Sequence, residues 1–222
     1  MRKETTMFHS KGPTLFELIK QALSSTKEGY DLLAPKFDFT PFLTPENVLN
    51  SAVSYLRSER TYDRAIDLCT GTGAGISALL PIVRKLIVGV DWSAPMLAEV
   101  HKKFNSGLWG PIVSLVCDDV FNIGYRYRSV FDLATCFGAL GHIERKRQRN
   151  FVSVVHSALR SGGQFAFVTS EKPRWYSPTF WLALGFDTVM RVRNLLLRPQ
   201  FIMYYLNFLL PEALGLFDKK NW

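Results

Sequence analysis

The 222-residue sequence lacks the features of a membrane-spanning or disulfide-stabilised protein. Its three cysteines, Cys69, Cys117 and Cys136, include no Cys-x-x-Cys pair, so we expect neither a disulfide framework nor a metal site. No uncharged apolar run reaches the roughly 18 residues of a spanning helix; the longest covers residues 199–211. The first residues, MRKETTMFHS, lack the apolar core of a secretory signal. We therefore expect a cytoplasmic protein.

The charge balance is positive but does not select a partner. The chain has 27 Lys and Arg against 19 Asp and Glu, a net charge of +8. Nucleic acid, anionic lipid, a negatively charged metabolite and a merely solvated basic surface all remain open. Charged residues make up 21% of the chain and apolar residues 47%, a composition that supports a folded core and excludes wholesale disorder.

The hydrophobic pattern divides the chain into three parts. They are a helical N-terminal lid at residues 1–62, a core of alternating strands and helices at residues 63–170, and an apolar helical segment at residues 171–222. We expect all three to form one compact domain. In the first part, Thr14 and Glu17 form a capping box before one helix, and Thr44 precedes another. Residues 30–39 between these helices are expected to be an aromatic-rich connection.

Five apolar segments of the middle part predict strands. They lie at residues 65–70, 85–91, 112–119, 130–137 and 164–170. Helices are expected between them, among them residues 75–83, which Pro81 kinks or ends, residues 94–104, and a basic helix that ends at Leu159. Residues 161–163, Ser-Gly-Gly, are expected to turn the chain into the fifth strand. This alternation predicts an α/β fold with a Rossmann-like parallel sheet and helices on both faces.

A glycine-rich turn, DLCTGTGAG, follows the first predicted strand. Gly71 and Gly73 can adopt dihedral angles closed to other residues, and the helix that follows presents free amide groups to a ligand. A simple tight connection would explain the same glycines. However, Asp91 ends the second strand, where a carboxylate can accept ribose hydroxyls, and Asp118 and Asp119 end the third, where one can accept an adenine amino group. Since these strand ends share one edge of a parallel sheet, we predict an adenosine ligand there.

Two common nucleotide-binding motifs are missing. The third glycine of a G-x-G-x-x-G fingerprint would fall on Ile76, and no G-x-x-x-x-G-K-[ST] phosphate loop occurs. Dinucleotides and nucleoside triphosphates are therefore disfavoured.

The ordered segments resemble class I S-adenosylmethionine-dependent methyltransferases, and their small-molecule branch in particular. The resemblance covers about residues 30–170 and is carried by YDLLAPKFD, AIDLCTGTGAG, VGVDWSAPML, VCDDVF, FDLATCFGALGHI and LRSGGQFAFV. It implies S-adenosyl-L-methionine as cofactor and in-line methyl transfer to a small, partly apolar metabolite through an oxygen, nitrogen or carbon atom. A catalytically weak cofactor-binding or regulatory protein on the same fold is the alternative.

The resemblance also implies roles for individual residues. Asp67 and the Gly71–Gly73 turn would hold the methionine end of the cofactor, and Asp91 would hold the ribose. The remaining expected cofactor-binding residues are Asp118 at the adenine amino group, Asp119 at the ring, Tyr30 closing from the lid, Trp92, Phe137 and Cys69. Cys69 stands where the family has its first glycine; a small side chain fits there if its φ is negative, so we expect weakened packing rather than lost binding.

The acceptor side is less defined by the sequence. His142 is the best-placed base for an acceptor hydroxyl, although a histidine that merely fastens its loop is the alternative. Nucleic acid is a disfavoured acceptor because CFGA occupies the place of the [ND]-P-P-[YF] motif, and the basic run at residues 144–150 fits a solvated face. The apolar C-terminal segment fits a hydrophobic lid or a peripheral membrane contact.

The closing antiparallel strands of the family are reduced or absent in the sequence. Residues 200–206 could supply one strand, and otherwise the fifth strand is an edge that needs cover. A short variant with helices over the edge, a homodimer and an incomplete chain are the three explanations left open.

Overall fold

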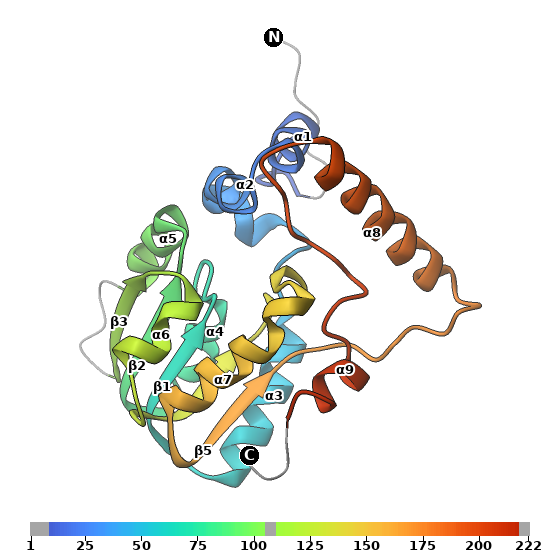
Figure 1. The fold of residues 1–222 in the computed structure, drawn as a ribbon. Coiled ribbons are helices and arrows are strands. Elements are labelled where there is room, and N and C mark those ends of the chain that lie inside the picture. The colour runs from blue at the N-terminus through green and yellow to red at the C-terminus, as the bar shows by residue number, and fades with distance from the viewer. Residues whose placement is uncertain (1–8, 105–109, 218–222) are drawn as a thin grey trace.

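The computed structural model describes residues 9–104 and 110–217 and contains, within them, a five-stranded parallel sheet (Figure 1). Its strands are β1 Tyr62–Leu68, β2 Val83–Asp91, β3 Ile112–Cys117, β4 Phe131–Cys136 and β5 Leu159–Phe167. They lie in the order β3-β2-β1-β4-β5. The chain therefore builds outward from β1 in one direction through β2 and β3, and in the other through β4 and β5. The predicted Rossmann-like sheet is confirmed.

The helices before the sheet begin where the sequence provides caps. They are α1 Leu15–Leu23, α2 Thr26–Leu33, a 3-10 helix Ala34–Phe39 and α3 Glu46–Glu59. The predicted capping box of α1 is present, with the Thr14 amide donating to the Glu17 carboxylate at 2.7 Å. The prediction of a connection at residues 30–39 is wrong, because a second capping box of Ser25 and Glu28 begins α2, whose last turn contains Tyr30.

The remaining helices alternate with the strands or follow them. They are α4 Ala74–Leu79, α5 Ala94–Phe104, α6 Ile123–Arg126, α7 Gln148–Ala158, α8 Pro178–Leu196 and α9 Leu210–Leu214. Three short 3-10 helices, Val120–Asn122, Leu140–His142 and Arg145–Arg147, lie in the loops. The α4 helix ends before Pro81, as expected, and α5 spans the predicted residues 94–104.

Alternate residues of the strands pack into two hydrophobic clusters, one on each face of the sheet. Ile66 and Val88 pack with Phe151 of α7 on one face. Ala65 and Ile87 pack on the other face, in the cluster that holds side chains of α3, α4 and α5. Because successive strand side chains point to opposite faces, this alternation buries both sides of the sheet.

β5 differs from its prediction. We expected a Ser-Gly-Gly turn followed by a strand at residues 164–170, but β5 begins at Leu159 and ends at Phe167. Leu159 pairs with Phe131 of β4, and Gln164 pairs with Leu133, so the intervening residues form an irregularity in the ladder. Gly162 lies in it with a φ of +71°, which explains the glycine. The turn expected from composition is therefore a bulge within the strand.

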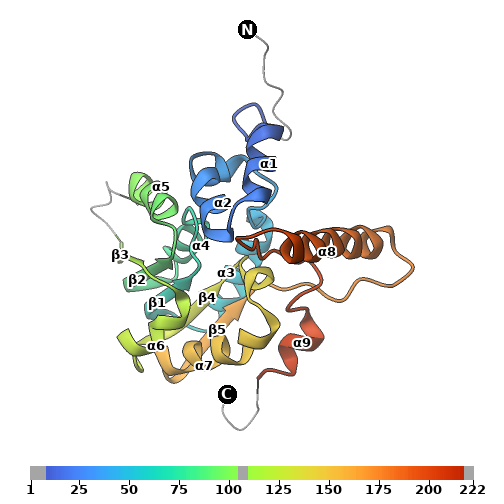
Figure 2. The ribbon, with the colours of Figure 1, turned by 45° about the horizontal axis from the view of Figure 1, so that its top comes forward.

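The C-terminal part adds no strand in the ranges that the structure describes. Residues 200–206 form a loop between α8 and α9, and α8 stands apart from the sheet (Figure 2). Near the β5 edge, the rings of Phe167 and Phe217 stack with centroids 5.5 Å apart. The Thr169 hydroxyl donates to the Phe208 carbonyl at 2.5 Å. The segment around α9 thus covers part of this edge. None of the described helices has the length and hydropathy needed to cross a bilayer.

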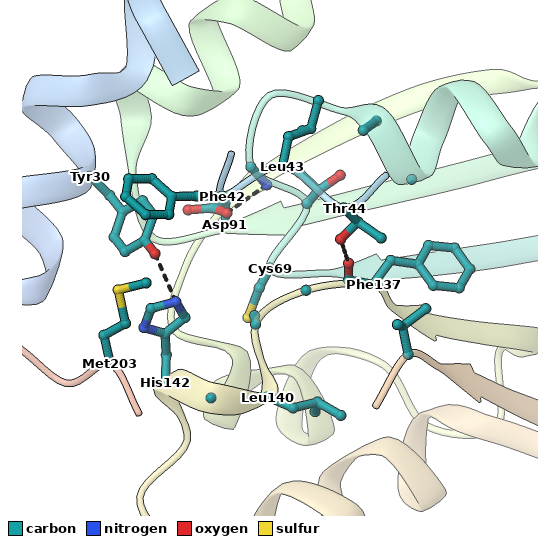
Figure 3. A pocket seen from close by; sticks show the side chains of 18 of the residues that line it. Tyr30, Phe42, Leu43, Thr44, Cys69, Asp91, Phe137, Leu140, His142 and Met203 are labelled. Carbon is teal, nitrogen blue, oxygen red and sulfur yellow. Dashed lines mark hydrogen bonds between the residues drawn. The ribbon is translucent and has the colours of Figure 1, made fainter. Parts of the chain in front are cut away.

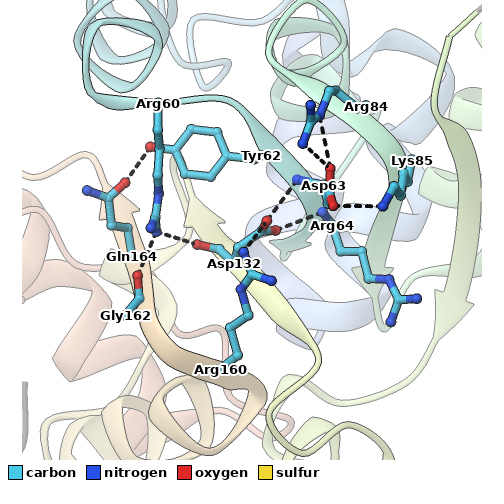
Figure 4. Close-up of polar contacts among 10 residues, drawn as sticks. All are labelled: Arg60, Tyr62, Asp63, Arg64, Arg84, Lys85, Asp132, Arg160, Gly162 and Gln164. Carbon is cyan, nitrogen blue, oxygen red and sulfur yellow. Dashed lines mark hydrogen bonds and ion pairs between the residues drawn. The ribbon is translucent and has the colours of Figure 1, made fainter.

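A polar network joins the amino ends of the strands (Figure 4). The buried Asp132 carboxylate accepts the amides of Asp63 and Arg64 at 2.8 and 2.7 Å, and the Arg160 guanidinium at 3.1 Å. Arg60 donates to the carbonyl of Gly162 at 2.7 Å. These contacts link β1, β4 and β5 at the edge opposite to the carboxyl ends, and so they fix the strands that carry the site.

Candidate functional site

A cavity of about 450 Å³ opens beyond the carboxyl ends of β1, β2 and β4. The strand order reverses beside β1, and ligands of parallel α/β sheets bind at such a position. Most predicted site residues line this cavity, namely Tyr30, Asp67, Cys69, Gly71, Asp91, Trp92, Phe137 and His142. The fold therefore brings residues from both sides of the predicted glycine-rich turn to one place (Figure 3).

The glycine-rich turn is folded onto the end of β2. The Gly71 amide donates to Asp91 Oδ2 at 2.8 Å, and the Ser93 amide donates to Asp91 Oδ1 at 2.9 Å. Burial raises the pKa of Asp91. Gly73 does not line the cavity but begins α4 with a φ of +88°, and a Cβ there would lie 3.2 Å from Val100. Gly71 thus shapes the cavity wall, whereas Gly73 shapes the turn behind it.

The backbone conformation of Cys69 differs from the negative φ that we expected. Its φ is +55°, in the left-handed region that glycine adopts without strain. Cys69 therefore has the backbone conformation of a glycine although it carries a side chain. A hydrogen bond with Cys136 and burial raise the pKa of the Cys69 thiol, which is consequently neutral at ordinary pH.

Asp67 is buried beneath the turn. Its carboxylate accepts the hydroxyls of Thr70 and Thr135 at 2.6 and 2.7 Å. Burial raises its pKa to about 6. A Cβ on Gly75 would lie 2.5 Å from Asp67 Oδ2, so only glycine lets α4 start this close to the carboxylate. Gly75 is a site-forming residue that the glycine spacing alone did not single out.

Tyr30 and His142 contact one another in the wall of the cavity (Figure 3). The Tyr30 hydroxyl lies 2.7 Å from His142 Nε2, and His142 Nδ1 lies 2.5 Å from the Ile202 carbonyl oxygen. Because a carbonyl can only accept, Nδ1 carries the hydrogen and Nε2 accepts from Tyr30. Burial lowers the pKa of His142, which keeps the ring neutral. The pair therefore presents a hydroxyl backed by a basic nitrogen.

Residues 65–163 match the family model of a methyltransferase domain. This range runs from β1 through the glycine-rich turn, Asp91 and His142 to the bulge of β5. These residues therefore form a methyltransferase domain, in agreement with the resemblance to class I S-adenosylmethionine-dependent methyltransferases that the sequence carries. The sequence expectation of a methyltransferase that uses S-adenosylmethionine is confirmed.

Individual relatives agree with this assignment. The methyltransferase is 25% identical over 231 residues to a demethylmenaquinone methyltransferase of Chlorobaculum tepidum, with 97% of this chain and 81% of the relative covered. A DhpI structure in complex with SAH has a TM-score of 0.54 at 24% identity, over 71% of this chain and 72% of that one. Magnesium protoporphyrin IX methyltransferase (ChlM) from Synechocystis PCC 6803 has a TM-score of 0.55 at 17% identity, over 77% and 69%. These two structures share the fold.

Besides Gly73, two predicted residues of the methyltransferase lie outside the cavity lining. Asp118 Oδ1 accepts the Asp119 amide and the Asn122 side-chain amide, both at 2.8 Å. Asp119 Oδ1 accepts the Phe121 amide at 3.0 Å. Both carboxylates therefore organise the turn after β3, and their expected adenine contacts stay a prediction.

Sequence reasoning missed the side chains that fasten the N-terminal helices over the cavity. Asp38 accepts the Thr72 hydroxyl at 2.5 Å and the Lys103 ammonium at 2.6 Å. Asp31 of α2 accepts the Ser93 hydroxyl at 2.5 Å. No local pattern marks these carboxylates, because each acts through a residue more than 30 positions away.

Sequence reasoning also missed part of the cavity wall that comes from the loop after α8. Met203, Tyr204, Tyr205 and Asn207 line the cavity from this loop. Their apolar and aromatic character indicated only a buried or lid segment, and tertiary folding alone brings them to the β4 end.

Proposed function

We propose that the methyltransferase transfers the methyl group of S-adenosylmethionine to a small, partly apolar metabolite. The observation that carries this proposal is the division of the cavity lining. Carboxylates and the glycine-rich turn lie at the β1 and β2 ends, whereas Phe37, Phe42 and Met203 come from other segments and add apolar surface to the lining. The similarity to a demethylmenaquinone methyltransferase agrees with an acceptor that has an apolar part.

In this proposal the carboxyl ends of the strands hold the cofactor. Asp91 already accepts two backbone amides, but each carboxylate oxygen has a second lone pair that can accept a ribose hydroxyl. Asp67 and Gly71 would lie at the methionine end, with Trp92 and Phe137 along the ligand. Asp118 and Asp119 would hold the adenine at the β3 end. The helices between residues 15 and 59 would act as the lid.

The reaction is an in-line displacement. When bound, S-adenosylmethionine would supply an activated methyl group, whose bond to the sulfur would break as its carbon bonds to the acceptor atom, with S-adenosylhomocysteine as the leaving group. Alignment of the two reactants in the cavity can supply about 7–11 kcal/mol of the barrier reduction. For an acceptor hydroxyl or amine, its proton would pass to the Tyr30 oxygen while the Tyr30 hydrogen moves to His142 Nε2. The second possibility is that the pair only fastens α2 to the loop.

The Tyr30→Phe variant tests the proton step. Transfer of a labelled methyl group to the small-molecule fraction of a cell extract should fall about 10²- to 10⁴-fold, because the acceptor proton loses its carrier. Binding of S-adenosylhomocysteine should stay within a few-fold of the parent. Tyr205→Phe is the matched control, since it removes another hydroxyl from the same cavity lining and should retain activity.

Equal rates for the two variants would remove the proton step from the proposal. Cofactor binding by the parent chain without any labelled product would instead favour the regulatory alternative.

A further inference from the structure

Helix α8 buries two polar side chains and Met190 against the protein and leaves most of its apolar side chains exposed to solvent. Its inner face buries Asp187 and Asn194, and the Asp187 carboxylate accepts the amides of Tyr205 and Leu206 at 2.7 and 3.0 Å. The outer face carries apolar side chains that are between 50% and 82% exposed. They recur at helical spacing and form what we call the α8 stripe: Trp181, Leu182, Val189, Val192, Leu195 and Leu196.

A second exposed apolar face lies beside the end of α8. The α1 helix exposes Leu15, Phe16, Ile19 and Leu23. The Arg193 guanidinium joins the two helices by donating to the carbonyls of Ala22 and Ser24 at 3.0 and 2.9 Å. In both ribbon views α8 stands apart from the sheet (Figures 1 and 2). Exposed apolar surface of this extent is typical of an interaction site.

The charges around the stripe favour a negatively charged partner. Lys172, Arg174, Arg191 and Arg198 are exposed on α8 and the segments that flank it, whereas Glu171 is the one exposed carboxylate between residues 171 and 200. A two-fold dimer through this face would place the same cations against each other, which costs energy. Exposed Trp175, Tyr176 and Trp181 add the amphipathic rings that gather where a membrane meets water.

We propose that the α8 stripe, together with the apolar face of α1, docks on an anionic lipid surface. The apolar side chains enter the boundary between headgroups and acyl chains, and the flanking cations contact lipid phosphates. Because Asp187 of α8 holds the loop whose Tyr205 lines the cavity, docking places the acceptor side of the cavity near the lipid. The inference stands on α8 itself and does not require the proposed reaction.

Co-sedimentation of the full chain with lipid vesicles tests the proposal. We expect the chain to bind vesicles of phosphatidylcholine with 30% phosphatidylglycerol at least tenfold more tightly than phosphatidylcholine alone, and added salt should weaken this binding. The Lys172→Gln/Arg174→Gln variant should lose about fivefold in affinity for each cation removed. The Leu182→Glu/Leu196→Glu variant should lose more than tenfold.

A matched control separates the stripe from a general charge effect. Tyr55→Glu/Tyr125→Glu adds the same two carboxylates at exposed positions on α3 and α6, and it should retain binding within twofold. Circular dichroism checks that the two double variants with added glutamates are folded. Equal loss in the two variants, or no binding by the parent chain, would overturn the proposal. A parent dimer that Leu182→Glu/Leu196→Glu dissociates, without vesicle binding, would assign the stripe to a second copy.

Discussion

Cys69 lies in the cavity wall with the backbone conformation of a glycine. A non-glycine residue in the left-handed region carries a steric cost of about 1–2 kcal/mol. The Cys69 side chain recovers part of this cost through its contact with Cys136. This residue therefore stores a small strain at the turn that approaches the ligand.

Two substitutions at this position separate strain from packing. Cys69→Ala keeps the strained backbone and loses the thiol, whereas Cys69→Gly also relieves the strain. We predict that the glycine variant is more stable than the alanine variant by about 1 kcal/mol, after allowing for the greater unfolded-state entropy of glycine. Urea unfolding of both variants measures the difference. An alanine variant as stable as the glycine variant would contradict the positive φ.

Asp67 gives the molecule a pH-dependent stability. Its pKa is raised from 3.8 to about 6, so the folded protein binds this proton more tightly than the unfolded chain does. The stabilisation is complete below pH 3.8 and is lost as the pH rises through about 6. Relative to Asp67→Asn, which cannot titrate, the free energy of unfolding should fall by about 2 kcal/mol between pH 4 and 7.

Unfolding curves at several pH values give this difference directly. A constant difference between parent and Asp67→Asn would show that the carboxyl titrates normally. If the ionised carboxylate also receives the cofactor amino group, binding of S-adenosylhomocysteine should strengthen above pH 6 in the parent and not in the variant.

At the scale of elements, local patterns predicted most of the sheet and its helices. The strands and α5 follow from apolar periodicity, and α1 follows from the capping box of Thr14 and Glu17. The bulge of β5 could not be predicted, because its register depends on pairing with β4. A composition-based reading of Gly162 therefore produced a turn where the strand continues.

The residues of the candidate site were also only partly predictable from the sequence. Asp67, Gly71 and Asp91 were predictable because they end strands of a parallel sheet. The contact of Tyr30 with His142 spans 112 positions, and no local signal marks it. The loop after α8 was likewise invisible as cavity wall, since only its hydrophobicity showed in the sequence.

The buried Asp187 lets α8 position that loop. Asp187→Ala leaves the amides of Tyr205 and Leu206 without their acceptor, at a cost of about 1–3 kcal/mol because these two donors are only partly buried. We predict a lower free energy of unfolding and a weaker acceptor affinity, with cofactor affinity unchanged because the β1 and β2 ends are not touched. Chemical unfolding and separate titrations of the two ligands measure these effects. A variant that loses cofactor affinity and keeps acceptor affinity would contradict this division.

At the scale of the whole molecule, three distant parts of the chain meet at one cavity. The core supplies the strand ends, the N-terminal helices close over them through Asp31 and Asp38, and the loop after α8 completes the other side. In the proposed function, the cofactor and acceptor sides would thus come from different segments. In such an arrangement, substitutions in the acceptor wall leave the cofactor end of the cavity unchanged.

The central claim is that the carboxylate of Asp91 holds an adenosine-type ligand at the end of β2. Calorimetric titration with S-adenosylhomocysteine, on the parent chain and on Asp91→Ala, tests it most directly. Asp63→Ala is the control, because Asp63 is a carboxylate at the opposite end of the strands. Loss of hydrogen bonds to a charged group predicts a roughly 10- to 100-fold weaker dissociation constant for Asp91→Ala and no change for Asp63→Ala. The same affinity in the parent and in a folded Asp91→Ala variant, or no binding by the parent, would contradict the account.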